Sequence, residues 1–341
     1  MSLKNLNAIR KNHKLLADQL NNKKIYKLYK KFKNNFSLEN SFSVGVSGGP
    51  DSLALAFFSK IYSLEKKLVS NFFIVDHGLR KNSKIEANEV KKLLLKFSIR
   101  AKILKWNGKK PSNNIQSVAR KNRYNLLIKE NKNLKIKNIL VGHHLNDQIE
   151  NFFIRLTRGS GLRGLVSFGK LNKINNMNIY RPLINFRKED LVYVAQNVFK
   201  SYINDPSNLN IDFKRVRIRN LFEALEKEGL DYVKFLDTFN NLQNSNKSIN
   251  LSAENNLMDN SYFSLKRKII ILNNSFFNQS QDTVFRSLSI CLNRINKKQY
   301  YVRGKKLIKL IDEIGSKNFK KTTLGGCIIK KVSQTVIISA E

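Results

Sequence analysis

The stretch Phe42-Ser43-Val44-Gly45-Val46-Ser47-Gly48-Gly49-Pro50-Asp51-Ser52 decides the fold. Its apolar first half predicts a strand over 42–46, and an amphipathic helix is expected over about 52–67. The two glycines between them allow a tight turn with exposed backbone N–H groups and no Cβ to block a phosphate oxygen. The helix N-terminus adds the positive end of its dipole, and Ser47 and Ser52 can donate hydroxyl hydrogen bonds. The stretch therefore predicts a phosphate-binding loop.

Asp51 adds a second ligand preference to this loop. A carboxylate is out of place in a pure anion site unless it meets Mg²⁺, which binds carboxylate and phosphate oxygens together. No lysine follows the glycines, so the loop is not of the GxxxxGK[ST] type. The alternative is an ordinary glycine-rich turn in which Asp51 or Ser52 caps the helix.

Outward from this loop, short apolar runs alternate with amphipathic stretches. This pattern predicts an α/β fold, a doubly wound and mainly parallel sheet of the Rossmann-like type. Because βαβ crossovers are right-handed, helices should cover both sheet faces. Ligands bind beyond the carboxyl ends of such strands, so the loops after Val46, Val75 and Gly142 should line one crevice. The expected strands are 42–46, 71–75, 100–106 and 136–142, and the expected helices are 52–67, 84–97, 115–130 and 146–157.

Composition limits the classes of function. The 341 residues include 63 Lys+Arg against 25 Asp+Glu, a formal charge of +38, and 41% are hydrophobic, enough for a core. The charge indicates an anionic partner, nucleic acid first, although an AT-biased genome would also enrich lysine. We find neither an apolar run of about 18 residues nor a secretory signal, and Cys291 and Cys327 form no CxxC pair. A cytoplasmic protein is expected.

Composition also changes along the chain, with an Asn- and Ser-rich stretch over 240–260. Beyond it, helices are expected near 279–295 and 303–314, and the runs 326–332 and 335–339 suggest a hairpin. The expected parts are a basic N-terminal helical extension (1–40), an ATP-binding catalytic domain (41–225), a helical, Asn-rich linker (226–260) and a small C-terminal α+β domain (261–341).

The string SGGPDS at 47–52 resembles the pyrophosphate-binding loop of the PP-loop ATP pyrophosphatase superfamily. Further strings, in family order from about residue 42 to 222, resemble one branch, the tRNA(Ile)-lysidine synthases. The C-terminal third matches more loosely, chiefly at TLGGC (323–327). The strings are VDHGLR (75–80), ARKNRY (119–124), GHHLNDQIE (142–150), RGSG (158–161), RPL (181–183), DPSN (205–208) and RIRN (217–220).

This resemblance implies a ligase that uses ATP and Mg²⁺ to join free L-lysine to C2 of the wobble cytidine of an isoleucine tRNA with a CAU anticodon. AMP transferred to the C2 oxygen makes that oxygen a leaving group, and the lysine ε-amine then attacks the carbon. The loop would hold the polyphosphate, Asp51 the metal, and the segment after the second strand would face adenosine. The residues so assigned are Ser47, Gly48, Gly49, Pro50, Asp51, Ser52, Asp76, His77 and Gly78.

Asp147 is the expected partner of the lysine amine. The ammonium of free lysine has a pKa of about 10.4, and a carboxylate can hold it in place and help to remove its proton. Arg120 would neutralise charge developing on phosphorus, although a solvated helix face is the alternative for Arg120 and Arg123. His143 is expected to reach the crevice as a catalytic residue, whereas His144 caps or packs. Adjacent histidines rarely converge on one ion, which disfavours zinc.

Two residues depart from the family pattern: Asn146 replaces the first Asp of a DD pair, and Asn151 replaces a Thr. If Asn146 occupies the amine-binding position, the assignment to Asp147 fails or the site is altered. Glu150, one helical turn from Asn146, is then the residue that can supply the missing charge.

Basic residues are the expected tRNA contacts, with solvated faces as the alternative. Gly159-Ser160-Gly161 would let a loop close over a flipped base, because chemistry on C2 needs an unstacked nucleotide. The C-terminal domain would bind the tRNA away from that base. Arg215 and Arg219 are expected on one helical face. The basic residues expected to contact the RNA backbone are Arg158, Arg163, Arg181, Arg187, Lys214, Arg215, Arg217 and Arg219.

Two rival functions stay open at this point. A PP-loop enzyme that inserts sulfur into tRNA commonly needs paired cysteines, and this chain has two isolated ones. A non-catalytic, basic RNA-binding protein would have little reason to keep the intact string at 47–52.

Overall fold

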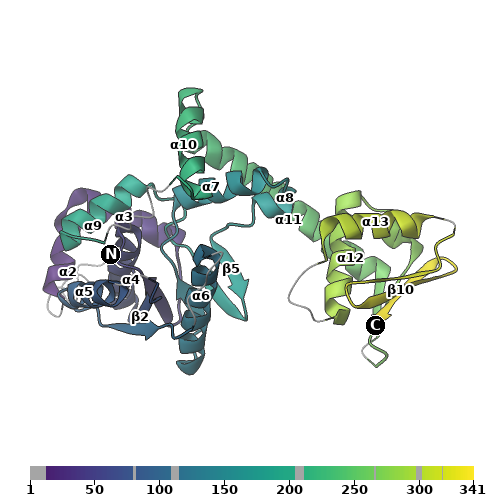
Figure 1. Cartoon of the computed structure of the whole chain (residues 1–341), viewed down its shortest axis with the longest axis horizontal. Helices are drawn as coiled ribbons and strands as arrows, with labels where there is room; N and C mark the ends of the chain where they lie inside the picture. Colours follow the sequence, from purple (N-terminus) through teal and green to yellow (C-terminus); the bar gives the residue numbers. More distant parts are fainter. Residues whose placement is uncertain are drawn as a thin grey trace. The chain divides into compact units, whose positions relative to one another are not determined.

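The protein is described by a computed structural model (Figure 1), in which two compact units, Met1–Asp231 and Tyr232–Glu341, are distinguished. The segment 205–208 of the family-like strings and Arg80 lie outside the described residues. The structure describes residues 13–79, 82–108, 115–203, 211–264, 266–296, 302–316 and 318–341.

A six-stranded sheet forms the centre of the first unit, in the order β3-β2-β1-β4-β6-β5. The strands from β3 to β6 run parallel, and β5 pairs antiparallel with β6 at one edge. Since β1 lies between β2 and β4, the chain order reverses there, at the switch point where open α/β sheets bind ligands. The strands are β1 (Phe42–Val46), β2 (Ser70–Asp76), β3 (Ala101–Lys105), β4 (Asn138–Leu140), β5 (Leu171–Ile174) and β6 (Met177–Tyr180).

Helices cover both faces of this sheet, as predicted. Successive residues of β2 separate into two cores: Phe72 and Ile74 pack with α4, whereas Phe73 packs with Leu127 of α6. The period of two follows from the pleat of a strand buried on both sides. The helices of this unit beyond residue 40 are α4 (Pro50–Lys66), α5 (Ser83–Leu95), α6 (Ile115–Asn133), α7 (Leu145–Leu156), α8 (Leu162–Leu165), α9 (Lys188–Phe199) and α10 (Lys214–Lys227).

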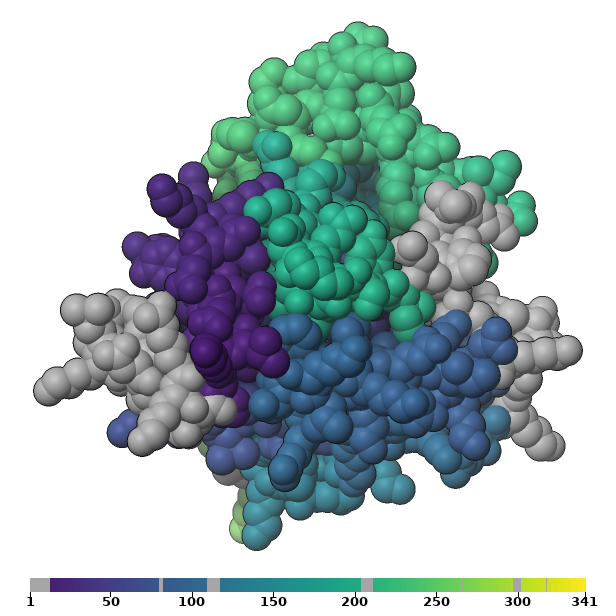
Figure 2. Space-filling view, turned by 90° about the vertical axis from the view of Figure 1, so that its left-hand side faces the viewer, coloured from purple at the N-terminus to yellow at the C-terminus, as the bar shows by residue number. Residues whose placement is uncertain are grey.

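The N-terminal helices pack into the main core of this unit. In α3 (Lys23–Asn35), Tyr29 and Phe32 are fully buried, and the ring of Phe32 lies 5.5 Å from that of Phe58 in α4. Asn22, which caps α3, donates to the Tyr193 hydroxyl of α9 at 3.1 Å. Figure 2 shows this face, with the purple N-terminal segment directly against the teal one. The described part of the expected extension thus belongs to the core. Two short elements precede α3: α2 (Lys14–Asp18) and η1 (Gln19–Asn21).

The second unit is built on an antiparallel sheet in the order β7-β8-β11-β10-β9. The hairpin expected from the two C-terminal runs is confirmed by the pairing of β10 with β11. Helices α12 and α13 pack on the sheet through Leu288, Cys291 and Leu310. The elements are α11 (Tyr232–Asn260), β7 (Ser261–Ser264), β8 (Ile269–Leu272), η3 (Asn274–Phe277), α12 (Gln281–Asn296), α13 (Gly304–Gly315), β9 (Lys321–Leu324), β10 (Cys327–Val332) and β11 (Thr335–Ala340).

The Asn- and Ser-rich segment forms the long helix α11, within the span expected to be a helical linker. Its exposed serines Ser248 and Ser252 donate to the carbonyls of Asn244 and Ser248, four residues earlier, which satisfies the hydroxyls within the helix. Asn256 is 3% exposed and donates to the Phe276 carbonyl at 3.2 Å. The helix belongs to the second unit, and the division falls at residue 231 rather than at 225.

None of the helices among the described residues is both long enough and apolar enough to span a bilayer.

Candidate functional site

The loop after β1 is held in shape by the hydroxyl of Ser52. Its Oγ accepts from the N–H groups of Ser47 and Gly48, each at 3.1 Å, and donates to the Gly49 carbonyl at 2.9 Å. Gly48 has a φ of +88°, and a Cβ there would lie 2.5 Å from Val90 Cγ2. Glycine is therefore required at this position. Two of the N–H groups expected to be exposed are instead bonded to the Ser52 hydroxyl.

The helix α4 begins directly behind this loop. Gly49 occupies the N-cap position and Pro50 the first turn, where a missing N–H costs no hydrogen bond. Asp51 follows in the same turn. Its Oδ2 lies 3.5 Å from Nε2 of His144, and its Oδ1 is buried without a hydrogen-bond partner among the described residues. A buried carboxylate oxygen without a partner fits a site that receives a cation.

The segment after β4 packs directly on this first turn. A Cβ at Gly142 would lie 3.2 Å from the backbone C and O of Asp51, so the two junctions are in close backbone contact. The segment after β2 borders the same edge. There Asp76 Oδ1 accepts from the Gly78 N–H at 2.9 Å, and Gly78 has a φ of +60°. His77 Nε2 lies 3.4 Å from Arg123 Nε, which donates to it. The three loops expected around one crevice thus follow adjacent parallel strands.

His144 is the N-cap of α7. Its Nδ1 accepts from the N–H of Asn146 at 3.3 Å, and its own N–H donates to Asp147 Oδ2 at 3.0 Å, which forms a capping box. Burial alone would lower the pKa of His144, but the carboxylates of Asp147 and Asp51 outweigh it and raise that pKa. Because Nδ1 accepts a hydrogen bond, the ring proton is on Nε2, which lies between the two junctions and is also 3.6 Å from Asp147 Oδ2.

Two buried carboxylates on α7 have opposite pKa shifts. Burial tends to raise the pKa of Asp147, but His144 and the hydrogen bond from its N–H lower it to about 2. The pKa of Glu150 is raised by burial and by the charge of Asp147, against the opposing effect of Arg219. Asp147 thus stays ionised at neutral pH, whereas Glu150 takes up a proton more readily than an ordinary glutamate. Such pairs commonly divide the acid and base roles of a site.

Helix α10 supplies the cations that face this pair. Arg219 Nε donates to Glu150 Oε1 at 2.5 Å. Arg215 lies between the two acids, with Nη1 3.8 Å from Asp147 Oδ1 and Nε 3.9 Å from Glu150 Oε2. Glu150 Oε2 accepts no hydrogen bond from the described residues. Like Asp51 Oδ1, it is therefore a buried carboxylate oxygen that can accept another donor.

A second cluster surrounds His143. Arg120 Nη1 lies 3.2 Å from His143 Nε2, and because a guanidinium can only donate, Nε2 accepts. Burial and the nearby arginines lower the pKa of His143 to about 3, against the charge of Asp147, so the ring is neutral at physiological pH. Arg120 also lies over the Tyr124 ring, 5.3 Å from its centroid. His143 is thus placed to orient Arg120, and its low pKa makes it a poor proton carrier.

Arg181 is an internal residue. It is 4% exposed, donates to the Gly169 carbonyl at 2.7 Å and to Asn172, and stacks over Phe168 at 4.4 Å. These contacts join β6 to the turn before β5. The expected phosphate contact of Arg181 is not supported by this position, because its guanidinium is enclosed by protein.

The other residues expected to contact tRNA differ in exposure. Arg158 and Gly159 are exposed, and Gly159 has a φ of +66°, so a left-handed turn there favours glycine. Ser160 donates its N–H to the Arg155 carbonyl at 3.0 Å, and Gly161 caps α8. Arg217 is exposed and donates to the carbonyls of residues 211 and 212, at the start of α10. Arg219 instead faces Glu150.

The structure therefore joins the loop at 47–52 to the α7 carboxylates through one imidazole. Sequence reasoning placed Arg215 among the RNA contacts and missed its position between Asp147 and Glu150. The four-residue spacing of Arg215 and Arg219 marked a shared helix face, but nothing in the spacing showed that the face meets α7. Tyr124 and Phe168, whose rings lie against the guanidinium groups of Arg120 and Arg181, were also missed.

The two cysteines lie away from this chemistry. Cys291 and Cys327 are both fully buried in the core of the second unit, and burial raises the pKa of the Cys291 thiol to about 12. Thiols in such surroundings are poor nucleophiles.

Comparison with known proteins identifies the chain's relatives. The family model described as a PP-loop domain matches residues 18–225. A tRNA(Ile)-lysidine synthase of Wolbachia pipientis wMel is 32% identical over 314 residues, 89% of this chain and 71% of that protein. One from Rickettsia bellii (strain OSU 85-389) is 31% identical over 92% of this chain and 74% of its own length. The match to the synthase of Orientia tsutsugamushi (strain Boryong), at 39% identity, spans 56% of this chain and 43% of that protein.

Among solved structures, the U34-tRNA thiolase NcsA from Methanococcus maripaludis is similar in fold. The superposition has a TM-score of 0.55 at 17% identity and covers 64% of this chain and 78% of that one. At this identity the likeness concerns the fold alone. The family match spans the glycine loop, the α7 carboxylates and α10, and the alignments to full-length relatives reach about nine-tenths of this chain. The chain therefore belongs to the tRNA(Ile)-lysidine synthases, a family of PP-loop proteins.

Proposed function

We propose that this protein uses ATP to join free L-lysine to C2 of the wobble cytidine of a tRNA(Ile) with a CAU anticodon. The PP-loop domain implies ATP binding, and the Wolbachia and Rickettsia relatives are named for this tRNA. One observation in the structure supports this proposal. His144 Nε2 lies 3.5 Å from Asp51 at the phosphate loop and 3.6 Å from Asp147 on α7, so a phosphate site and an ammonium site adjoin.

In the first step, the C2 oxygen of cytidine attacks the α-phosphorus of ATP and pyrophosphate leaves. The residues Ser47 to Ser52 bind the polyphosphate, with the N-terminus of α4 behind it. Asp76, His77 and Gly78 border the same edge and face the adenosine. Arg120 stabilises the charge on the transferring phosphoryl group, and the neutral ring of His143 holds its Nη1 in position at 3.2 Å.

In the second step, the lysine ε-amine attacks C2, the C–O bond breaks, and AMP departs with the oxygen. Lysine arrives as an ammonium, with a pKa of about 10.4 in water, and must lose a proton. Asp147, with its low pKa, supplies permanent negative charge. Glu150, with its raised pKa and a buried Oε2 that accepts no hydrogen bond from the described residues, takes the proton. Asn146 needs no charge in this scheme.

Mg²⁺ fits the site through Asp51, whose buried Oδ1 has no hydrogen-bond partner among the described residues. When bound there, the ion would neutralise charge on the polyphosphate. Asp51 and the phosphate oxygens would hold it, and His144 would fix the other carboxylate oxygen of Asp51.

The tRNA contacts are proposed for exposed basic residues, Arg158 and Arg217 among them, and for the second unit. The turn at Gly159 to Gly161 has open space around both glycines, where a Cβ would meet nothing within 4 Å, and would close over the flipped base. Contacts with many phosphates predict a steep loss of affinity as salt is added. This work would take place in the cytoplasm, where tRNA is modified.

Pyrophosphate release tests the proposed reaction. We expect release that requires tRNA(Ile), that continues beyond one turnover only when lysine is present, and that is absent when the same tRNA carries uridine at the wobble position. Tight tRNA binding without release would instead indicate a non-catalytic RNA-binding protein. Release that requires a sulfur donor rather than lysine would indicate thiolation, which the burial of both cysteines opposes.

A further inference from the structure

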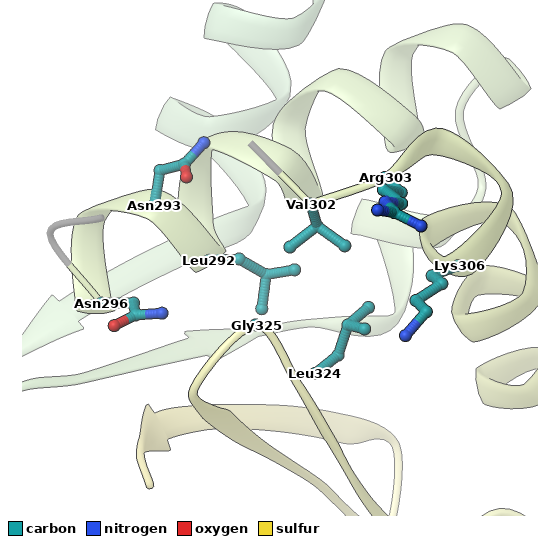
Figure 3. A pocket seen from close by; sticks show the side chains of 8 residues that line it. All are labelled: Leu292, Asn293, Asn296, Val302, Arg303, Lys306, Leu324 and Gly325. Atoms are coloured by element: carbon teal, nitrogen blue, oxygen red, sulfur yellow. The ribbon is translucent and has the colours of Figure 1, made fainter. Parts of the chain in front are cut away.

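A cavity of about 230 Å³ lies in the second unit, far in sequence from the loop that binds phosphate (Figure 3). It is formed where the end of α12, the start of α13 and the turn after β9 meet. The family-like strings of the first unit contribute nothing to it. The residues that line it are Leu292, Asn293, Asn296, Val302, Arg303, Lys306, Leu324 and Gly325.

The middle of the cavity is apolar. Leu292, Val302 and Leu324 surround it, and Leu292 is 2% exposed and part of the unit's core. Gly325 sets how closely the β9–β10 turn approaches. Its φ is +67°, and a Cβ there would lie 2.7 Å from Val302 Cγ2. The apolar surface is therefore held at a fixed distance by a position that requires glycine.

The rim of the cavity carries donors and positive charge. Arg303 and Lys306 lie together at one side, with Asn296 opposite. Both cations are exposed, and neither forms an ion pair or a side-chain hydrogen bond with a described residue. Asn293 Nδ2 is buried and has no hydrogen-bond partner among the described residues. None of the described residues in the lining is acidic.

From this combination we propose that the cavity binds one nucleotide of an RNA. Its phosphate would meet Arg303 and Lys306, its base would lie on the apolar middle, and the amide of Asn293 would donate to a base oxygen or nitrogen. Charge complementarity favours an anion, and the apolar middle favours one that carries a flat ring. The volume is below the ~300–1,000 Å³ of drug-sized sites, so it admits a single nucleotide.

The source of this nucleotide rests on the proposed function, which makes the bound RNA a tRNA(Ile). The same chemistry would also suit a free mononucleotide. All of the residues that line the cavity belong to the second unit, and the PP-loop belongs to the first.

The test compares two double variants of the full chain. Arg303→Ala with Lys306→Ala removes the cavity's cations, and Lys305→Ala with Lys309→Ala removes the same charge from exposed positions of α13 outside the lining. For tRNA(Ile) at fixed salt, the cavity pair should weaken binding roughly tenfold and reduce the salt slope by about one to two, whereas the control pair changes affinity less than about twofold. Equal losses in both pairs would overturn the proposal.

A third variant tests the amide. Asn293→Asp keeps the size of the side chain but replaces the buried donor with a carboxylate oxygen, so it should also weaken tRNA binding roughly tenfold. Thermal unfolding checks that the variant folds. A folded Asn293→Asp protein that binds tRNA normally would contradict the assignment of Asn293 to the ligand.

Titration with CMP distinguishes the two sources. Saturable CMP binding that is lost in the Arg303→Ala, Lys306→Ala protein, with tRNA affinity unchanged, would assign the cavity to a free nucleotide. If neither CMP nor tRNA binding depends on these residues, the cavity is not a nucleotide site. Lysine incorporation at saturating tRNA should be normal in the cavity variants. If the wild type made no lysidine but tRNA affinity still fell in these variants, the proposed reaction would fail and this site would stand.

Discussion

The β1–α4 and β4–α7 junctions lie side by side at the carboxyl edge of the sheet, and they are built differently. At the first, the shape comes from the backbone: Gly48 adopts a φ of +88°, and the Ser52 hydroxyl bonds two N–H groups. At the second, the shape comes from charged side chains, with the acids of α7 facing Arg215 and Arg219 of α10. A polyphosphate needs donors at fixed positions, whereas an ammonium needs carboxylate oxygens.

The largest effect on stability and activity is expected from Gly48→Ala, which changes the β1–α4 junction, whose shape comes from the backbone. The residue would be forced into a left-handed conformation at about 1–2 kcal/mol, and its Cβ would clash with Val90 at 2.5 Å. We expect a loss of stability of about 2 kcal/mol or more in urea unfolding, and pyrophosphate release reduced more than about 100-fold.

Gly49→Ala is the matched control. Gly49 has a φ of −71°, and a Cβ there would lie no closer than 4.0 Å to its neighbours, so stability should fall by no more than about 1 kcal/mol, the cost of alanine at an N-cap. If both substitutions destabilise the protein equally, the left-handed conformation of Gly48 is not what gives this loop its shape.

The next largest effect is expected at the β4–α7 junction, whose shape comes from charged side chains. Glu150→Gln removes the proposed proton acceptor, so lysine incorporation should fall about 100-fold while tRNA binding stays within about threefold. The wild-type rate should rise as pH rises through the raised pKa of Glu150, because the base must be ionised, and the variant should lack this limb. The measurement is the rate of labelled-lysine incorporation across pH.

Asp147→Asn separates the two carboxylates. Because the pKa of Asp147 is lowered to about 2, its loss should raise the KM for lysine and leave the pH limb in place. If the rise of the rate with pH disappears in Asp147→Asn but persists in Glu150→Gln, then Asp147 rather than Glu150 takes the proton from lysine.

Ser52→Ala tests the hydroxyl that closes the glycine loop. It leaves the N–H groups of Ser47 and Gly48 without their acceptor, at a cost of about 1–3 kcal/mol. The KM for ATP should rise. Ser59, on the same helix, is fully buried and its Oγ has no hydrogen-bond partner among the described residues. Ser59→Ala should therefore change urea stability by less than about 0.5 kcal/mol, and a similar loss at both serines would contradict the role of Ser52.

The smallest effect is expected from His144→Asn, which addresses the link between the junctions. Asparagine is also a good N-cap, so α7 should lose less than about 1 kcal/mol of stability. The imidazole that lies between Asp51 and Asp147 is removed, and the KM values for ATP and for lysine should both rise a few-fold. An unchanged KM for ATP would show that the two junctions act independently.

The difference between the β1–α4 and β4–α7 junctions explains which features the sequence could predict. The β1 strand was placed at its observed ends, and the helix after the loop, expected from about residue 52, begins at Pro50. Both elements depend on local features: an apolar run, two glycines and a helix start. Gly48 has a positive φ, a conformation that glycine adopts more readily than any other residue. The Asn- and Ser-rich α11 was expected to link two domains, since composition alone does not show that its polar side chains bond within the unit.

The charged site could be predicted only in part. Residues 143 to 150 were expected near the crevice, yet which carboxylate retains an open oxygen depends on Arg219, 69 residues further along the chain. Arg181 was assigned to RNA because arginine commonly binds phosphate, whereas the contacts with Gly169 and Phe168 arise from a hairpin, β5–β6, whose short strands gave no clear pattern. Contacts between distant segments of the chain decided both outcomes.

Mass analysis of tRNA nucleosides tests the central claim most directly. The purified full chain is incubated with ATP, isotope-labelled lysine and unmodified tRNA(Ile), and the nucleosides are then separated. We predict one new nucleoside with the mass of cytidine condensed with labelled lysine, which appears only when ATP is present. Unaltered cytidine under conditions in which the enzyme consumes ATP, or a product that lacks the label, would contradict the account.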